Sequence, residues 1–194
     1  MKLDKESMDT IFEEARTHRY FEKGEIPDET LIRLYDILKL APTLANCQPA
    51  RFVFVKSPEA KKRLLPYVYD SNARKVDEAA VTVIVANDTK FYEYMPRLYP
   101  QANFLTMFSE NEEFAKSAMI SSGSMQGAYL IIAARALGLD CGPLGGFNNA
   151  AVDKEFFPDG RWKSNFLCNL GTGVKSKLHP REDRLKFEEA CKIV

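Results

Sequence analysis

Four consecutive residues near the N-terminus carry side chains that can bind a phosphate group. This basic segment consists of Arg16, Thr17, His18 and Arg19. Guanidinium, imidazolium and hydroxyl groups donate hydrogen bonds, and those from charged donors hold a phosphate dianion strongly. Such a cluster is also typical of a solvated helix end, where cations interact favourably with the helix dipole. The basic segment therefore predicts an anion site if other segments supply the rest of a pocket.

Two further segments offer groups suited to a flat, polar ring. The first is a glycine run over residues 142–147, where missing Cβ atoms let backbone N–H groups approach a ligand closely. The second is an amide loop over residues 41–49, where Asn46 and Gln48 present uncharged groups that donate and accept hydrogen bonds. Each is also compatible with an ordinary turn. Together with the basic segment, they predict a site for flavin mononucleotide.

Other catalytic motifs are missing from the sequence. Residues 171–173, Gly-Thr-Gly, lack the third glycine of a nicotinamide-binding fingerprint, and neither a P-loop nor a nucleophile elbow is present. The four cysteines have no C-x-x-C spacing and there are two histidines, so we predict no metal site. We expect buried, unreactive thiols, including Cys47, for which the sequence identifies no base partner.

The elements that must position these segments are predicted from periodicity and capping residues. Helices are expected at residues 8–15 with Ser7 as N-cap, after Asp28 as N-cap and ending at Pro42, and after Ser57 as N-cap. Two more are expected at residues 114–137, before Gly138, and at residues 152–156. Strands are expected at residues 51–55, 81–86 and 165–170. Because the second strand is apolar enough to lie inside a sheet, the sheet should be covered on both faces. We predict three layers: helix, sheet, helix.

Three regions leave alternatives open. An aromatic segment over residues 91–108 contains six aromatic residues and two prolines, which predicts a folded excursion that is either a satellite hydrophobic cluster or a substrate-pocket lid. The second half of the long helix is apolar nearly all round, as in a dimer interface or the core of a monomer. A terminal amphipathic piece is expected at residues 187–194.

Composition limits the classes of function. The chain has 194 residues, 45% apolar and 28% charged, so we expect a single domain spanning residues 1–194. Basic and acidic residues each total 27, which leaves no net charge to attract nucleic acid or anionic lipid. No apolar run reaches the ~20 residues of a membrane span, and no signal peptide is recognisable. We expect a cytoplasmic protein that acts on a small molecule, with no nucleic-acid or membrane partner.

In order and spacing, these segments resemble the FMN-dependent nitroreductase family. The basic segment and Phe21 match the family's basic, hydroxyl, basic pattern with a following aromatic residue. The amide loop matches its A-P-S/T-x-x-N-x-Q-P segment, and residues 143–147 match its P-x-x-G-F loop. Within the family, the chain is most similar to the malonic semialdehyde reductase subgroup, through residues 15–18, 45–47, 91–93 and 163–165. The resemblance implies a homodimeric α+β fold with a central mixed sheet between helical layers.

The resemblance also implies roles for individual residues toward FMN. The phosphate and ribityl end would be held by Arg16, Thr17, His18, Arg19 and Arg184. The pyrimidine side would be lined by Asn72 and Lys75, and the ring would be passed by Pro143, Leu144, Gly145 and Gly146, with the Gly145 N–H near N5. The flavin of the partner subunit would be reached by Pro42, Thr43, Leu44, Asn46 and Gln48.

Three residues depart from the family pattern. Many relatives have a basic residue at Ala15, a tryptophan at Ala50 and a lysine at Glu182. The first and third departures alter the phosphate end, and the second leaves the pocket floor smaller or differently filled.

The implied activity is that of an FMN-dependent NAD(P)H oxidoreductase. NADH or NADPH would donate hydride at flavin N5, without a dedicated catalytic residue of the protein. The acceptor would be a nitroaromatic, a quinone, an enone or a short semialdehyde such as malonic semialdehyde. Two alternatives remain: a non-catalytic FMN-binding or sensing protein, and a cofactor-free domain that dimerises through its apolar helix.

Overall fold

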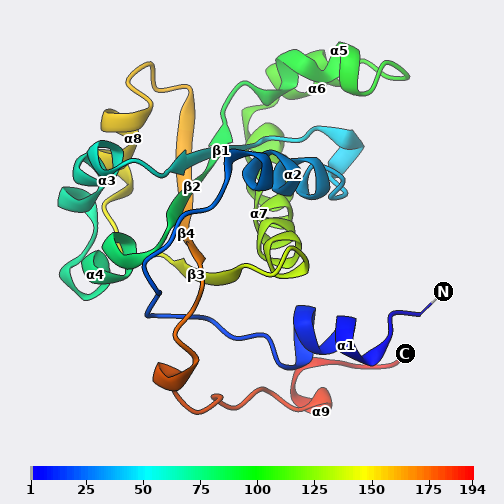
Figure 1. The fold of residues 1–194 in the computed structure, drawn as a ribbon. Helices are drawn as coiled ribbons and strands as arrows, with labels where there is room; N and C mark the ends of the chain where they lie inside the picture. Colours follow the sequence, from blue (N-terminus) through cyan, green and yellow to red (C-terminus); the bar gives the residue numbers. More distant parts are fainter. Residues whose placement is uncertain (1) are drawn as a thin grey trace.

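A four-stranded sheet forms the centre of the protein in this computed structural model, which describes residues 2–194 (Figure 1). The strands lie in the order β1-β2-β4-β3. Their bounds are β1 Ala50–Val55, β2 Val81–Asp88, β3 Asp140–Leu144 and β4 Trp162–Gly171. All three pairings between them are antiparallel, whereas a mixed sheet was expected. The parallel component is an isolated bridge between Thr17 and Cys141, because the basic segment meets β3 over too short a length to form a strand.

Helices cover both faces of this sheet, which confirms the predicted three-layer α+β architecture (Figure 1). The helices are α1 Lys5–Met8, α2 Asp28–Leu38, α3 Pro58–Leu64, α4 Asp70–Glu78, α5 Met95–Leu98, α6 Phe104–Ser109, α7 Glu112–Ala136, α8 Asn149–Phe156 and α9 Phe187–Ala190. Shorter helical turns lie at Asp9–Glu13, Leu44–Asn46, Leu65–Tyr67, Phe91–Tyr94 and Lys175–Lys177.

Strand β2 explains why both faces are covered. Every residue of β2 is buried. Val81, Val83 and Val85 pack in a core cluster with α2 and α7, while Ile84 and Ala86 pack in a second cluster with α3, α4 and α8. Since successive side chains of a strand point to opposite faces, a strand with buried apolar side chains on both faces requires a helical layer on each side.

Several predicted helix ends are confirmed and others need correction. The Ser57 hydroxyl accepts the Ala60 N–H at the start of α3, and Gly138 takes a φ of 77° after α7, as expected. The first helix instead begins at Lys5, because the Asp4 carboxylate rather than Ser7 provides the cap. Pro27, not Asp28, occupies the capping position of α2.

Strand β3 was not predicted. Residues 142–144 belong to the glycine run, which was interpreted as a loop because glycine and proline are depleted in strands. They form β3 because it lies at the sheet edge, where a proline without an N–H is tolerated. The loop proper therefore begins at Gly145.

The aromatic segment is a folded excursion, as predicted. It forms the Phe91–Tyr94 turn, α5 and α6, and it contributes Phe91, Met95 and Phe108 to a third hydrophobic cluster. The Phe108 ring centroid lies 5.0 Å from that of Phe91 and 5.0 Å from that of Phe114 on α7. The satellite cluster is thus present.

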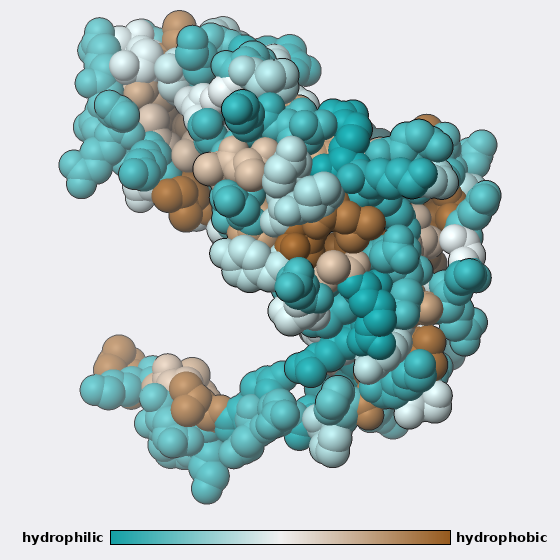
Figure 2. All heavy atoms as spheres, turned by 90° about the vertical axis from the view of Figure 1, so that its left-hand side faces the viewer, coloured by the Kyte–Doolittle hydropathy of each residue, from teal (hydrophilic) through white to brown (hydrophobic). Residues whose placement is uncertain are grey.

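The two ends of the chain form arms that project from the body. Helices α1 and α9 lie near each other, apart from the sheet and its helices (Figure 1), and Arg181 donates a hydrogen bond to the Glu13 carbonyl. Figure 2 shows this projection across a hollow from the body. Neither α1 nor α9 contains a buried residue, and the expected terminal helix at residues 187–194 is helical only over α9. Among residues 2–194, no helix combines the length and apolar character needed to cross a bilayer.

Candidate functional site

The basic segment lies along the outer edge of β3. Thr17 pairs with Cys141, and the His18 N–H donates to the Cys141 carbonyl at 2.9 Å. In this extended stretch, Thr17 and Arg19 are exposed while His18 is buried. The contact brings the basic segment beside the strand that leads into the rest of the glycine run, although more than 120 residues separate them in sequence.

The His18 side chain has a structural role, which differs from the predicted cofactor contact. Its Nε2 atom lies 3.3 Å from Asp140 Oδ1, and its ring packs so closely on Gly173 that a Cβ there would collide with it. Burial lowers the pKa of His18, and the Asp140 carboxylate opposes this effect only in part. The alternation of an extended backbone turns this imidazole inward while its neighbours turn outward.

A cationic cavity of about 380 Å³ lies between the basic segment and the C-terminal residues. The predicted residues Arg16, Thr17, Arg19 and Arg184 line it together. The C-terminal chain is held there by a bond from Arg16 Nη2 to the His179 carbonyl at 2.5 Å. Additional cations line the cavity: Arg135, Lys177 and Arg181. This donor set suits a phosphate group.

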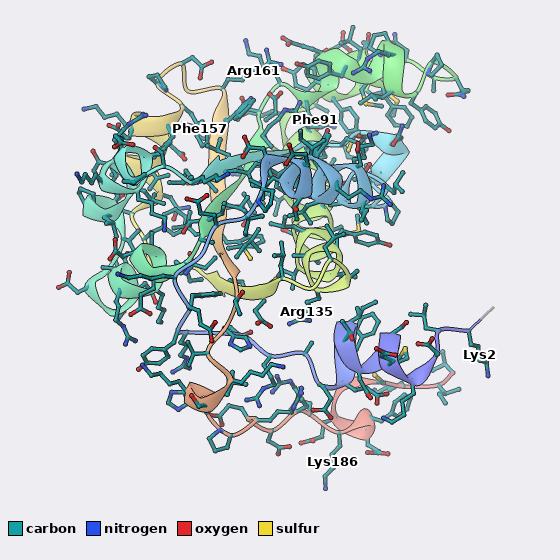
Figure 3. The ribbon with its side chains drawn as sticks, in the orientation of Figure 1. Lys2, Phe91, Arg135, Phe157, Arg161 and Lys186 are labelled. Carbon is teal, nitrogen blue, oxygen red and sulfur yellow. The ribbon has the colours of Figure 1, made fainter. Side chains whose placement is uncertain are left out.

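Arg135 is a candidate that the sequence analysis missed. It lies on the last turn of α7, between the body and the arms (Figure 3), and one Nη donates to the Ile11 carbonyl. Its Nε is buried without a hydrogen-bond partner among the described residues. Arg135 lines the cationic cavity, where its guanidinium charge suits an anionic ligand. No motif marks Arg135, because α7 reaches this cavity only through the folded arrangement.

A second set of predicted residues meets at the glycine run. Lys75 Nζ donates to Asn72 Oδ1 at 2.6 Å, and Asn72 Nδ2 donates to the Gly146 carbonyl at 3.2 Å. A Cβ on Gly146 would collide with Asn72 Nδ2, so a larger residue here would displace the Asn72 side chain. At Gly145, by contrast, no atom lies within 4 Å of where a Cβ would be, which leaves open space beside its backbone.

Electrostatics connect this second set to the basic segment. Burial lowers the pKa of Lys75, and the nearby cations Arg19 and Arg74 lower it further. A site that gathers cations in this way favours binding of a negatively charged group. Arg19 and Lys75 therefore lie on one side of the protein with the glycine run.

The amide loop lies elsewhere in the same chain. Asn46 Nδ2 donates to the Leu98 carbonyl on α5 at 3.0 Å, and the Leu44 N–H donates to Ser122 Oγ on α7 at 3.2 Å. Figure 1 places this loop beyond the C-terminal end of α2, away from the basic segment. Within one protomer, the basic segment, the Asn72–Lys75 region and the glycine run thus lie together, whereas the amide loop lies apart from them.

The backbone of the amide loop is strained. Ala45, Asn46 and Gln48 have φ values of 46°, 55° and 41°. Residues with side chains pay a cost in this left-handed region, and such residues concentrate at functional sites. This conformation supports a binding role for the loop rather than an ordinary turn.

Most of the thiols are buried, as expected. Cys47, Cys141 and Cys168 are buried, whereas Cys191 is exposed on the C-terminal arm, contrary to prediction. Burial raises the pKa of the Cys47 thiol, which makes it a poor nucleophile.

The three-layer α+β fold thus has a cationic cavity where the basic segment meets the start of β3, and open space beside Gly145 just after the end of β3. The chain belongs to the nitroreductase family, whose model matches residues 13–172.

Individual relatives agree with this assignment. The chain is 50% identical over 192 residues to a protein of Ralstonia nicotianae named "Putative NADH dehydrogenase/NAD(P)H nitroreductase", covering 99% of this chain and 98% of that one. It is 51% identical over 187 residues to a similarly named protein of Rhodopseudomonas palustris, covering 96% and 95%. Its fold matches the structure of "a putative nitroreductase in complex with FMN" from Exiguobacterium sibiricum with a TM-score of 0.88 at 21% identity, covering 100% of this chain and 99% of that one.

Proposed function

We propose that this protein is an FMN-dependent oxidoreductase that transfers hydride from NAD(P)H to a small organic acceptor. One observation carries the proposal: the basic segment, the Asn72–Lys75 region and the glycine run converge in the folded chain, with Arg184 beside the first. The names of the two curated relatives support NAD(P)H as donor, and the FMN complex with the same fold supports the cofactor.

The residues of this chain would divide the binding of FMN between them. The side chains of Arg16, Thr17, Arg19 and Arg184 hold the phosphate and ribityl end, assisted by Arg135. Asn72 and Lys75 lie along the pyrimidine side. Pro143, Leu144, Gly145 and Gly146 line the ring, with the Gly145 N–H toward N5. His18 takes part through its backbone, because its side chain is turned inward.

When bound, FMN would supply a ring that accepts one hydride, and with it two electrons, from the nicotinamide and passes the two electrons on to an acceptor. The protein positions this ring and stabilises its negative charge. Lys75 is the cation placed for that purpose, since Asn72 orients its ammonium group at 2.6 Å. We assign no side chain of the protein to proton transfer.

The complete site would require two copies of the chain. Pro42, Thr43, Leu44, Asn46 and Gln48 would approach the flavin of the partner subunit, because within one chain their loop is held by α5 and α7 instead. The projecting arms support a homodimer, since Leu185, Phe187 and Ile193 expose most of their apolar surface. Residues 1–194 would act as one domain within it.

The acceptor would be a nitroaromatic, a quinone, an enone or a short semialdehyde such as malonic semialdehyde. The aromatic segment would select among them, because it packs beside the amide loop through Asn46 and Leu98. The alternative function is an FMN-binding or sensing protein without turnover.

Three measurements on the purified protein separate these functions. Its absorbance spectrum shows whether flavin is bound, anaerobic addition of NADH or NADPH shows whether the flavin is reduced, and a panel of the four acceptor classes shows what reoxidises it. We expect a yellow protein that is bleached by a nicotinamide and recovers with at least one acceptor. A colourless protein that does not bind added FMN contradicts the proposal, and a yellow one that resists reduction by both nicotinamides supports the sensing alternative.

A further inference from the structure

A buried carboxylate at the end of β2 joins two arginines from distant parts of the chain. The Asp88 side chain is 1% exposed. Its Oδ2 atom accepts from Arg51 Nη2 at 2.7 Å, and its Oδ1 atom accepts from Arg161 Nε at 3.0 Å. Oδ1 also accepts the Lys90 N–H at 2.9 Å. A buried charge held by two guanidinium groups has a well-defined geometry, because each pairing is both ionic and hydrogen-bonded.

From Asp88, Arg51 extends to the amide loop. Its Nη1 atom donates to the Gln48 carbonyl at 3.0 Å and to the Ala50 carbonyl at 2.8 Å. These carbonyls lie at the end of the loop, and Gln48 is itself one of its residues of positive φ. Arg51 therefore holds a strained backbone to the sheet, and strained conformations persist only where surrounding contacts maintain them.

From the other side of Asp88, Arg161 extends to the aromatic segment. Its Nη2 atom lies 2.8 Å from Glu93 Oε2, and its guanidinium carbon lies 5.9 Å from the centroid of the Tyr94 ring. Figure 3 shows Arg161 and Phe91 at the same end of the sheet. The bond from Asn46 Nδ2 to the Leu98 carbonyl then connects the aromatic segment back to the amide loop.

These contacts form a closed circuit, which runs from the amide loop through Arg51, Asp88 and Arg161 to the aromatic segment and back. A cavity of about 420 Å³ lies next to it, and part of its wall comes from α2, β1, α7 and β4. The amide loop contributes Gln48 to its wall, the aromatic segment contributes Tyr94, Arg97 and Leu98, and Arg51 lies between them. The two segments and Arg51 therefore form a continuous part of the wall of this cavity.

We infer that Arg51 and Arg161, joined through Asp88, are positioning residues that hold the amide loop and the aromatic segment as one unit and thereby determine which acceptors are reduced. The part concerning acceptors rests on the proposed function. The part concerning the two segments does not, because the circuit belongs to the chain alone. Removing one contact of the circuit should loosen the segment on its far side.

Conservative variants separate positioning from charge neutralisation. Arg161→Lys keeps a cation but loses the planar group that contacts Asp88 and Glu93 together. Arg51→Lys keeps an ion pair with Asp88 but cannot also bond both carbonyls. Asp88 itself is left intact, because its removal would leave two arginines without compensation and endanger folding. The matched control is Arg63→Lys, since Arg63 pairs with Glu155 at 2.7 Å and lies over Phe156 away from the circuit.

The first measurement is hydrogen exchange of the protein as purified. Arg161 makes no hydrogen bond to the amide loop among the described residues, yet we expect Arg161→Lys to accelerate exchange of the amides at residues 44–48 about tenfold, a size typical of coupled neighbours. Arg63→Lys should leave those amides unchanged. Unchanged exchange in Arg161→Lys would overturn the inference, whether or not the protein binds FMN.

The second measurement compares kcat/KM for a small quinone and a bulky nitroaromatic. We expect Arg51→Lys to change the ratio of the two values about tenfold, because a shift of the cavity walls affects acceptors of different size unequally. Equal losses for both acceptors would show general damage and would also overturn the inference. If the wild-type protein reduces no acceptor, the proposed function fails, and the exchange result alone decides whether the circuit operates.

Discussion

The two histidines of the chain lie in opposite environments, which makes the role of His18 measurable. Burial lowers the folded-state pKa of His18, whereas a histidine in the unfolded chain titrates near 6.5. The unfolded chain therefore binds a proton that the folded chain resists. The stability associated with neutral His18 is present above about pH 6.5 and is lost as pH falls through the lower folded-state pKa.

We accordingly predict a pH-dependent difference between wild type and His18→Gln. The free energy of unfolding of wild type should exceed that of the variant by more at about pH 8 than at about pH 5.5, as measured by urea denaturation. A gap between wild type and His18→Gln that stays constant with pH would show that the imidazole titrates freely and does not have the structural role described.

Variants of Lys75 test the proposed site through the reduction potential of bound FMN rather than through turnover. We expect Lys75→Ala to lower the reduction potential of bound FMN by about 30 mV, which for two electrons corresponds to roughly 1.4 kcal/mol lost from the reduced state. Lys75→Arg, which retains the positive charge, should lie closer to wild type. Equilibrium dye titration of each purified variant gives the potential. If the alanine variant keeps the wild-type potential, Lys75 does not face the flavin.

At the scale of elements, the packing of the basic segment on β3 depends on a glycine. A Cβ on Gly142 would lie 2.5 Å from the His18 carbonyl oxygen, a backbone atom that cannot move without displacing the basic segment. Glycine within a strand often marks such a close approach of another backbone. Gly142 is therefore needed for packing within the chain, whereas the sequence analysis placed it beside a ligand.

We predict that Gly142→Ala lowers the free energy of unfolding by about 1–3 kcal/mol, as overpacking typically does, and weakens FMN binding because the cations of the basic segment move. Urea denaturation and titration with FMN measure the two effects. The same change at Gly24, where no atom lies within 4 Å of the added Cβ, should alter neither. If the Gly142→Ala protein bound FMN with wild-type affinity, the packing of the basic segment on β3 would not be needed for cofactor binding.

At the scale of the whole molecule, the arms carry large apolar side chains that the rest of the chain does not cover. Leu185, Phe187 and Ile193 are 72%, 55% and 89% exposed, although each is apolar. Full burial of such a side chain stabilises a protein by roughly 1.5–3 kcal/mol. Contact with a second copy of the chain would provide this burial. The body also exposes apolar side chains on α2 and α7, among them Ile32, Met125 and Tyr129.

We predict a dimer in sedimentation experiments and a shift toward monomer for the double variant Phe187→Ser, Ile193→Ser. Because the amide loop would approach the partner's flavin, the same variant should bind FMN more weakly at low protein concentration. Leu105→Ser, which changes an exposed apolar residue on α6, serves as the control. A wild-type protein that sediments as a monomer while retaining FMN would refute the shared site.

The sequence by itself determined the elements whose signals are local. Periodicity and composition identified β2 as a buried strand, Ser57 and Gly138 marked helix ends, and the order of three motifs indicated the family. Such signals lie within a few residues of the structure they specify, since capping, strand alternation and φ preferences act over one or two turns of chain.

Tertiary structure alone decided which of these elements meet. It made a strand of residues 140–144, turned His18 inward, and brought Arg135 to the cationic cavity. It also joined Arg51 to Arg161 through Asp88. Each of these outcomes depends on contacts between residues dozens to more than a hundred positions apart. Such contacts form only when the packing of the layers fixes the path of the chain, and no local pattern of residues encodes them.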